Sequence, residues 1–377
     1  MPRAIACMLK ESIHDHTSYR IKLNELECLI EALGYEVRGE VLQTKPEPDV
    51  AFLFGRGKVI EMSELVKRQE IDTVFVYNVL TSKQKLNLTR ELNAEVLDRY
   101  ELTLRIFDEN AIDALSRLQI ELARLSKLFP YYKLQASIAL RTEHPSLRSM
   151  GEYAFHRKVT LLRKRIAKLR RRIKKLRDEK IKRINARREL GFKTVCISGY
   201  FNAGKTSLFN VLTGSRKPVS DQPFTTLSSK YQKRYFEGQS VLFVDTIGFV
   251  IGLDPKLIES FELNLQDLRS SDIVLFLVDA SDPIPVLFLK LRSGLNFLDR
   301  LRVDRDDTLI ILSKADLVEP VKRRRVLSSL EPLLVGHDWM WASAKSRENV
   351  SLLLRKIAEK TMVEAGPAGE LVGAKAD

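Results

Sequence analysis

One eight-residue stretch constrains the fold of this chain more than any other part of its sequence. Residues 199–206 read Gly-Tyr-Phe-Asn-Ala-Gly-Lys-Thr and match the pattern G-x-x-x-x-G-K-S/T in full. A β-branched run at Thr194–Ser198 precedes the stretch, and an apolar helical pattern at Ser207–Leu212 follows it. A strand, a glycine-rich turn and a helix in this order form a loop whose backbone N–H groups face phosphate oxygens. The sequence therefore predicts an α/β domain in which a mostly parallel, Rossmann-like sheet carries a phosphate-binding loop (P-loop).

The residues of this loop have separate expected roles. Gly199 and Gly204 allow the backbone to wrap around the phosphates. Lys205 would reach the β- and γ-phosphates, and the Thr206 hydroxyl would bind Mg²⁺. The other loop residues expected to contact the nucleotide are Asn202, Ala203 and Ser207.

A second motif offers groups for the metal ion and the γ-phosphate. The apolar run Val241–Val244 ends at Asp245, whose carboxylate can hold Mg²⁺ through water. Gly248 follows three residues later, and its missing side chain lets the backbone N–H approach the γ-phosphate. We therefore expect Thr206 and Asp245 to share one metal ion.

A candidate switch segment, Asp221–Leu227, lies between these two motifs. A threonine hydroxyl in it can complete the coordination of Mg²⁺ while a γ-phosphate is present, which would order the segment in the GTP state. Thr226 is favoured over Thr225 as this third metal ligand, and Phe224 belongs to the same binding segment.

Two later motifs select the base. Asp316 follows the apolar run Thr308–Leu312, and its carboxylate can accept hydrogen bonds from N1–H and the 2-amino group of guanine. Adenine offers no such pair of donors, so Asp316 would select guanine. Lys314 can lie along the base, and a backbone N–H near Ala344 could face guanine O6. The remaining residues expected at the base are Ser313, Ser343 and Lys345. Four motifs in this order predict binding of GTP and GDP.

Hydrolysis needs a positioned water and positive charge near the phosphoryl oxygens. Lys205, Thr226 and Gly248 are the residues expected to contribute, together with Mg²⁺. Phe249 follows Gly248 and can neither orient nor activate water, and the sequence identifies no arginine finger. We therefore expect slow intrinsic turnover that a partner accelerates by ordering the switch segments.

These motifs resemble the HflX family of translation-linked GTPases, within the larger Obg/Era-like group. The resemblance is carried by Asp245–Val250, the Phe-Thr-Thr-Leu switch and Val278–Pro283, and also by Phe54–Val59 and Leu118–Leu125. It covers nearly the whole chain apart from the C-terminal tail. It implies a GTPase that uses Mg²⁺, associates with the large ribosomal subunit, and acts in ribosome splitting, rescue or biogenesis.

Two departures from the family pattern stand out. Ser313 occupies the position where the family usually has Asn, which is expected to lower nucleotide affinity while Asp316 keeps the preference for guanine. The family's Gly-rich loop between the linker helices is reduced to His144–Glu152. In family members studied on ribosomes this loop is near the peptidyl-transferase region, so the same contact is in question here.

The remaining sequence predicts three further parts. Residues 1–110 alternate helical patterns with strand patterns and predict a small parallel α/β domain; the expected strands are Ala4–Leu9, Val50–Phe54, Thr73–Tyr77 and Glu95–Leu97. Residues 111–190 contain two apolar seams of alternating three- and four-residue spacing, which predict an antiparallel helical hairpin. Its first helix would stop at Pro130, and 130–154 would be a loop. The GTPase domain would span 191–364, followed by a disordered tail, 365–377.

Positive charge is concentrated in one segment. The chain carries 63 Lys and Arg against 49 Asp and Glu, a formal charge of +14, and residues 151–190 alone hold 17 of the former and 4 of the latter. This concentration indicates a polyanionic partner. We expect residues 157–188 to bind ribosomal RNA phosphates; a membrane surface, an acidic protein or a patch within the chain are the alternatives.

Two other functions stay open: a nucleotide-gated RNA-binding module whose hydrolysis is too slow to matter, and a signalling GTPase whose hairpin docks an acidic protein. No apolar run approaches the length of a membrane span, and the N-terminus lacks a signal-peptide pattern. We expect a cytoplasmic monomer without a membrane partner. The three cysteines include no Cys-x-x-Cys pair and are expected to be reduced and buried.

Overall fold

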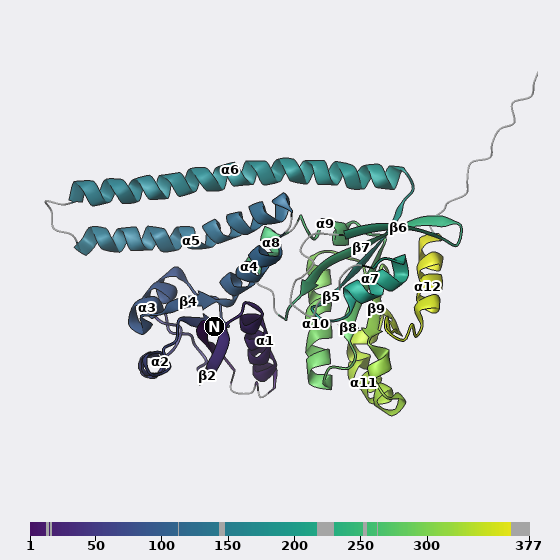
Figure 1. The fold of residues 1–377 in the computed structure, drawn as a ribbon, viewed down its shortest axis with the longest axis horizontal. Helices are drawn as coiled ribbons and strands as arrows, with labels where there is room; N and C mark the ends of the chain where they lie inside the picture. The colour runs from purple at the N-terminus through teal and green to yellow at the C-terminus, as the bar shows by residue number, and fades with distance from the viewer. Residues whose placement is uncertain are drawn as a thin grey trace, which may run out of the picture.

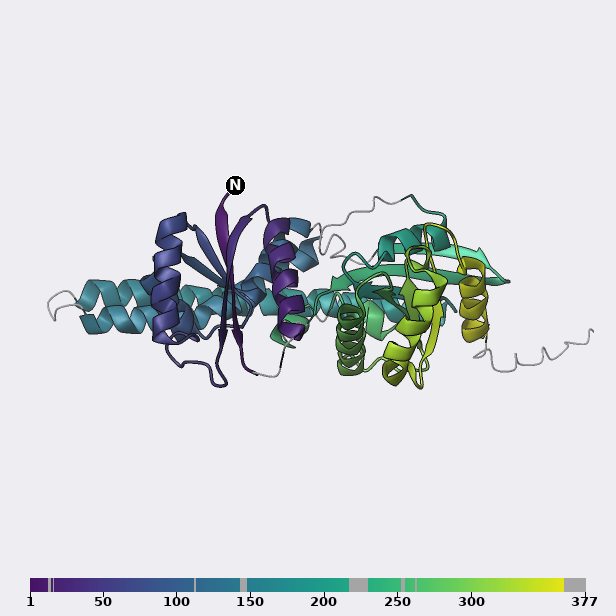
Figure 2. The same cartoon turned by 90° about the horizontal axis from the view of Figure 1, so that it is seen from below.

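The computed structural model describes residues 1–12, 15, 17–111, 113–142, 148–216, 230–251, 255–261 and 263–362. They form two α/β domains and a long helical hairpin. In Figure 1 the hairpin lies along the upper side of the molecule, with the two domains side by side beneath it. Figure 2 gives the view from below, in which both sheets are seen with helices packed beside them.

The N-terminal domain is built on a four-stranded, fully parallel sheet of order β2-β1-β3-β4. Its strands are β1 (Arg3–Lys10), β2 (Glu36–Thr44), β3 (Thr73–Val76) and β4 (Glu95–Asp98). Its helices are α1 (Ser18–Ala32), α2 (Arg56–Gln69), α3 (Ser82–Leu92) and α4 (Arg99–Asn110). The predicted small parallel α/β fold of this region is confirmed.

The prediction of a strand at Val50–Phe54 in this domain is wrong. Residues 50–54 form a turn closed by a single bridge between Asp49 and Leu53, and the edge strand is β2 instead. The Asp49 carboxylate accepts hydrogen bonds from the N–H groups of Ala51 and Phe52, which favours a turn. Leu53 and Phe54 are buried whereas Val50 is exposed, so only the end of the apolar run contributes to the core, and it does so from a turn.

The hairpin consists of α5 (Ala114–Thr142) and α6 (Arg148–Glu189), which pack against each other. Pro130 does not end the first helix, and the expected loop over 130–154 is wrong, because both helices extend into it. The Lys158 ammonium lies 4.4 Å from the ring centre of Tyr132, so packing against α6 continues past the proline. This packing offsets the hydrogen bond that a proline removes from a helix.

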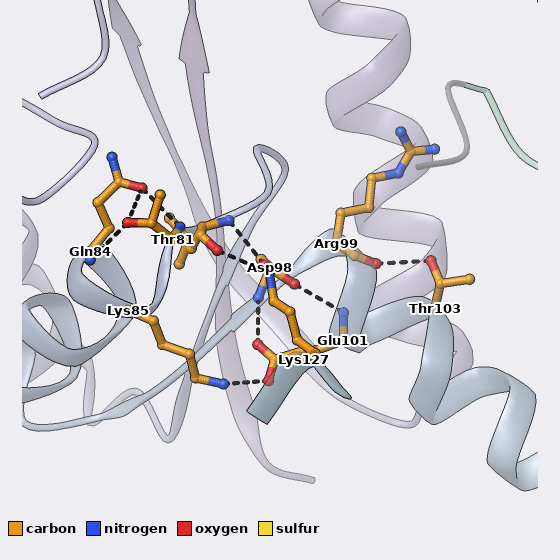
Figure 3. A network of polar contacts seen from close by, with 9 residues as sticks. Thr81, Gln84, Lys85, Asp98, Arg99, Glu101, Thr103 and Lys127 are labelled. Carbon is orange, nitrogen blue, oxygen red and sulfur yellow. Dashed lines mark hydrogen bonds and ion pairs between the residues drawn. The ribbon is translucent and has the colours of Figure 1, made fainter. Parts of the chain in front are cut away.

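A buried carboxylate fixes the hairpin to the N-terminal domain. The Lys127 ammonium of α5 lies 2.6 Å from Asp98 Oδ2 and donates to the Leu80 carbonyl at 2.9 Å. Asp98 is fully buried, accepts from Leu80 N–H, and caps α4 by accepting from Glu101 N–H. Figure 3 shows this network at the carboxyl end of β4. The hairpin therefore has a defined position on the first sheet.

The second domain has a six-stranded sheet of order β10-β9-β8-β5-β7-β6, parallel except for β6. The strands are β5 (Lys193–Tyr200), β6 (Lys230–Phe236), β7 (Gln239–Phe249), β8 (Ile273–Asp279), β9 (Thr308–Ser313) and β10 (Asp338–Trp341). The helices are α7 (Lys205–Thr213), α8 (Pro255–Ser260), α9 (Gln266–Arg269), α10 (Ile284–Arg300), the 3₁₀ turn η1 (Ala315–Leu317), α11 (Pro320–Leu334) and α12 (Val350–Met362). The expected mostly parallel α/β fold with a P-loop is confirmed.

Three smaller expectations meet the structure in different ways. Cys7 and Cys196 are buried as expected, whereas Cys28 is exposed, which corrects the expectation for that thiol. In the described part of the chain, no helix has both the length and the apolar character needed to cross a membrane. The tail at 365–377 lies outside the described residues.

Candidate nucleotide site

The P-loop connects β5 to α7 through backbone conformations that favour glycine. Gly199 has φ 139°, and a Cβ there would lie 2.2 Å from the Leu277 carbonyl oxygen of β8. Asn202 and Gly204 have φ 58° and 82°. These positive φ values turn the chain around a concave backbone and allow α7 to begin at Lys205.

Lys205 and Gly248 come from separate motifs and meet at the floor of this loop. The buried Lys205 ammonium donates to the Tyr200 carbonyl at 2.7 Å, and a Cβ on Gly248 would lie 2.8 Å from the same nitrogen. A side chain at position 248 would therefore displace the lysine. Burial lowers the pKa of Lys205 to about 8, partly opposed by the nearby Asp245 carboxylate. A phosphate group would add a closer counter-charge for this ammonium.

Thr206 and Asp245 form an oxygen pair beside the lysine. The Thr206 hydroxyl donates to Asp245 Oδ2 at 3.1 Å, and Asp245 is fully buried within β7. The described residues contain no group of three or more His, Cys, Asp or Glu that could hold a metal ion by themselves. Two oxygen groups beside a phosphate loop fit Mg²⁺, which takes most of its ligands from phosphate and water.

The last residue of β9, Ser313, contacts the P-loop. Its hydroxyl lies 2.8 Å from the Ala203 carbonyl and 2.9 Å from the Val278 carbonyl, so one proton is shared between the P-loop and β8. Lys314 extends the contact: its ammonium lies 2.7 Å from Asp279 Oδ2 and 3.4 Å from Asn202 Oδ1. Ser313 thus links the end of β9 to the P-loop through its hydroxyl.

Asp316 lies exposed beside the second base-binding turn. Its Oδ1 accepts from the hydroxyl of the buried Ser343 at 2.6 Å, and that hydroxyl accepts from Ser346 N–H at 3.1 Å. Lys345 is exposed in the same turn. The structure therefore brings Asp316 and Ser343 together, with the carboxylate at the surface where a base edge could reach it.

The remaining expected residues are placed less directly. Ser207 lies half-buried in the first turn of α7, and Ala344 lies half-buried after Ser343. Phe224, Thr225 and Thr226 lie outside the described residues, so the expected switch contact to Mg²⁺ stays a prediction.

The sequence did not indicate that the N-terminal domain contacts the segment after Gly248. Glu25 of α1 accepts from Ile251 N–H at 2.8 Å, and the Arg99 guanidinium of α4 donates to the Ile251 carbonyl. Glu25 and Arg99 are buried and paired at 2.8 Å. Further along, Phe261 packs edge-to-face on Phe107 with ring centres 4.6 Å apart. No local pattern could reveal these contacts, because the partners are far apart in sequence.

The base-binding turns also depend on residues that the sequence motifs did not include. Arg323 of α11 forms a two-pronged ion pair with Glu348, with N–O distances of 2.6 and 3.0 Å, and donates to the Ala315 carbonyl at 2.8 Å. Ala315 precedes Asp316, and Glu348 lies in the turn that contains Ser343. Arg323 therefore links both turns at the base end of the site.

Comparisons with known proteins agree with this geometry. A family described as "50S ribosome-binding GTPase" matches residues 194–314, and one described as "GTP-binding GTPase N-terminal" matches residues 20–108. The chain is 38% identical to GTPase HflX of Thermofilum pendens, over 89% of this chain and 79% of the relative. It is 33% identical to GTPase HflX of Methanocaldococcus jannaschii, over 92% of this chain and 85% of the relative. A crystal structure of an SsGBP and GDP complex is similar, with a TM-score of 0.53, 25% identity, and coverage of 96% of this chain and 99% of that one.

Proposed function

Because this chain belongs to the HflX family of GTPases, we propose that its GTPase cycle controls binding to the large ribosomal subunit through the helical hairpin. The single observation that carries this proposal is the exposed cationic surface of α6, in a chain whose G domain matches a family described as binding the 50S ribosome. Ribosome splitting, rescue or biogenesis is the proposed context, and the protein would act as a cytoplasmic monomer.

The cationic surface of α6 suits the phosphate backbone of folded RNA. Leu169 and Ile184 are buried, whereas Lys and Arg occupy most of the exposed positions around the helix. Exposed cations of this surface include Lys164, Lys168, Arg171, Arg172, Lys174, Lys175 and Lys182. Cations along a rigid helix contact phosphates and release counterions, so binding would weaken steeply with salt.

The nucleotide site would work as four matched parts. Lys205 and the P-loop N–H groups would hold the phosphates, and Thr206, Asp245 and Thr226 would hold Mg²⁺. The metal, when bound, would neutralise charge on the β- and γ-phosphates. Gly248 N–H would face the γ-phosphate, and Asp316 would read guanine, supported by Ser313, Lys314 and residues 343–345. These roles rest on the meeting of Lys205 with Gly248 and of Thr206 with Asp245.

Slow intrinsic hydrolysis is part of the proposal. Phe249 is buried, with its ring centre 4.3 Å from that of Phe297 and 6.1 Å from that of Phe276. In this position it packs the core and cannot orient an attacking water. Lys205, Mg²⁺ and backbone N–H groups would then stabilise the phosphoryl charge, and a ribosomal partner would accelerate the reaction by ordering the switch segments.

A chain of contacts supports coupling between the γ-phosphate site and the hairpin. The segment that follows Gly248 reaches α5, where Gln119 donates to the Ser260 carbonyl at 2.9 Å and Asn264 donates to the Ser116 hydroxyl at 2.9 Å. It also reaches α6, where Lys180 pairs with Asp267 at 2.6 Å. A shift of Gly248 toward a γ-phosphate would therefore act on the base of the hairpin.

Cosedimentation with purified large subunits tests the proposal. We expect tighter binding with a non-hydrolysable GTP analogue than with GDP, and strong loss of binding in the triple variant Lys168→Gln, Arg171→Gln, Lys175→Gln. The control Lys67→Gln, Arg68→Gln, Lys83→Gln removes three exposed cations from the N-terminal domain. GTP turnover should rise with large subunits and fall back as salt increases. Equal binding of the GTP and GDP forms would disprove the coupling.

Two other functions would give different results. Binding to an acidic protein that survives RNase treatment would favour a signalling GTPase. RNA binding that responds to nucleotide while turnover stays negligible with every ribosomal ligand would favour a gated RNA-binding module. A Lys205→Ala variant separates the gated RNA-binding module from a protein that binds RNA regardless of nucleotide. RNA affinity should change in this variant only if nucleotide binding controls it.

A further inference from the structure

We propose that Arg323 is a positioning residue for guanine recognition: with Glu348 it holds the two turns that place the Asp316 carboxylate. This inference rests on the proposed role of Asp316 and adds residues that the nucleotide motifs do not contain. Arg323 and Glu348 belong to α11 and to the turn before α12, and they meet behind the base end of the site.

Four hydrogen bonds fix the Arg323 guanidinium. It donates to both Glu348 carboxylate oxygens at 2.6 and 3.0 Å, to the Ala315 carbonyl at 2.8 Å, and to the Val318 carbonyl at 3.2 Å. Its centre lies 5.1 Å from the ring centre of Trp341 in β10. A planar group with this many partners has essentially one position.

Two of these contacts, to Ala315 and to Glu348, lead to Asp316 by a short path. The Ala315 carbonyl belongs to the peptide group that joins Ala315 to Asp316, so Arg323 fixes the backbone from which the carboxylate projects. On the other side, the Glu348 carbonyl accepts from Ser343 N–H at 3.1 Å, and the Ser343 hydroxyl donates to Asp316 Oδ1 at 2.6 Å. Both the backbone and the side chain of Asp316 are thus held by the same ion pair.

Recognition of guanine by one carboxylate depends on the orientation of that carboxylate. N1–H and the 2-amino group must both reach the carboxylate, so a small rotation of Asp316 breaks one of the two hydrogen bonds. Asp316 itself is exposed, which means that packing around its side chain cannot fix its orientation. The Arg323–Glu348 pair, whose side chains are 25% and 31% exposed, provides that support from behind.

The test compares the affinities for GDP and for inosine diphosphate (IDP), which lacks the 2-amino group. In the unmodified protein we expect GDP to bind about ten-fold more tightly, the value of one charge-assisted hydrogen bond. Arg323→Lys keeps the charge but loses the forked contacts, so the ratio should fall to about two-fold or less. Arg324→Lys on the same helix, at an exposed position, is the matched control and should keep the full ratio.

A ratio of affinities separates positioning from mere stability, because a partly unfolded protein loses both ligands equally. Glu348→Gln keeps the shape of the side chain but removes its charge, and it should also lower the ratio of GDP to IDP affinity. It provides the test if Arg323→Lys does not fold. An unchanged ratio in both variants would overturn the inference. Asp316→Asn reports on the proposed function itself: if this variant keeps the ratio, the assignment of Asp316 to guanine is wrong, whatever Arg323 does.

Discussion

Arg99 and Glu25 form an ion pair whose side chains are nearly fully buried, with 7% and 5% of their surfaces exposed. Both side chains hydrogen-bond to the backbone of Ile251 in the second domain. The Glu25 carboxylate accepts a hydrogen bond from Ile251 N–H, and the Arg99 guanidinium donates one to the Ile251 carbonyl oxygen. Arg99 also donates to the Tyr77 hydroxyl at 2.7 Å. The N-terminal domain therefore holds the chain three residues after Gly248, next to the proposed γ-phosphate contact.

Arg99→Ala should destabilise the protein by about 3 kcal/mol, because it leaves the Glu25 carboxylate buried without its cation. Urea titration followed by circular dichroism measures the change. The matched control is Arg38→Ala, which removes the partner of Glu36 in a pair whose side chains are 44% and 42% exposed. That surface pair should contribute less than about 1 kcal/mol. Similar losses in the two variants would contradict the prediction.

The buried ammonium of Lys205 predicts a pH dependence of stability. Its pKa is about 8 in the folded chain against an ordinary 10.5, so between these pH values the unfolded chain binds more protons than the folded one. The free energy of unfolding therefore increases as pH rises through this window. Below pH 8 the buried charged lysine lowers the free energy of unfolding by up to about 3 kcal/mol.

Lys205→Met removes this pH-dependent contribution to stability. Without nucleotide, the variant should be more stable than the unmodified protein at pH 7, and the difference should shrink to about 1 kcal/mol by pH 10. Chemical denaturation at several pH values measures it. Lys67→Met, at an exposed position, is the control and should show no such trend. A difference that is constant with pH would show that burial does not disfavour the charged lysine.

The parts of the site that sequence predicted are those set by local backbone. Gly199 and Gly204 are required by the positive φ values of one continuous loop, so their spacing is visible in the chain. Contacts between distant segments leave no such pattern: Glu25 and Ile251 are 226 residues apart. The Arg323–Glu348 pair is likewise set by how two turns pack, although its members are only 25 residues apart.

The errors in the fold arose where tertiary packing overrode a local signal. Pro130 is a strong helix stop in isolation, yet α5 continues to Thr142 because the second helix packs along it. The apolar residues before Gly55 have the composition of a strand, but Asp49 caps a turn there. Before Gly55 the apolar run correctly indicated that Leu53 and Phe54 are buried, but it indicated the wrong secondary structure.

Two helical glycines should respond to alanine in opposite directions. A Cβ on Gly294 of α10 would lie 2.1 Å from the ring of Phe276, which is fully buried in β8 and stacked on Phe249. Gly294→Ala should therefore destabilise the second domain by about 1–3 kcal/mol.

Gly57 of α2 is exposed and has nothing within 4 Å of its Cβ position. Gly57→Ala should stabilise by up to about 1 kcal/mol. Thermal unfolding of the two variants checks the signs, and stabilisation by Gly294→Ala would contradict the close helix–sheet packing.

The Ser313 hydroxyl hydrogen-bonds to the carbonyls of Ala203 and Val278. It therefore links the P-loop to the base-binding turn and is not available to the phosphates or the base. Ser313→Ala leaves both buried carbonyls without this donor, at a cost of about 1 kcal/mol to the arrangement that binds nucleotide. We expect affinity for GDP and for IDP to fall together by about five-fold, with their ratio unchanged, in contrast to Arg323→Lys. Titration calorimetry measures both affinities, and Ser328→Ala at an exposed position of α11 is the control. If the ratio changes instead, Ser313 acts on Asp316 rather than on the P-loop.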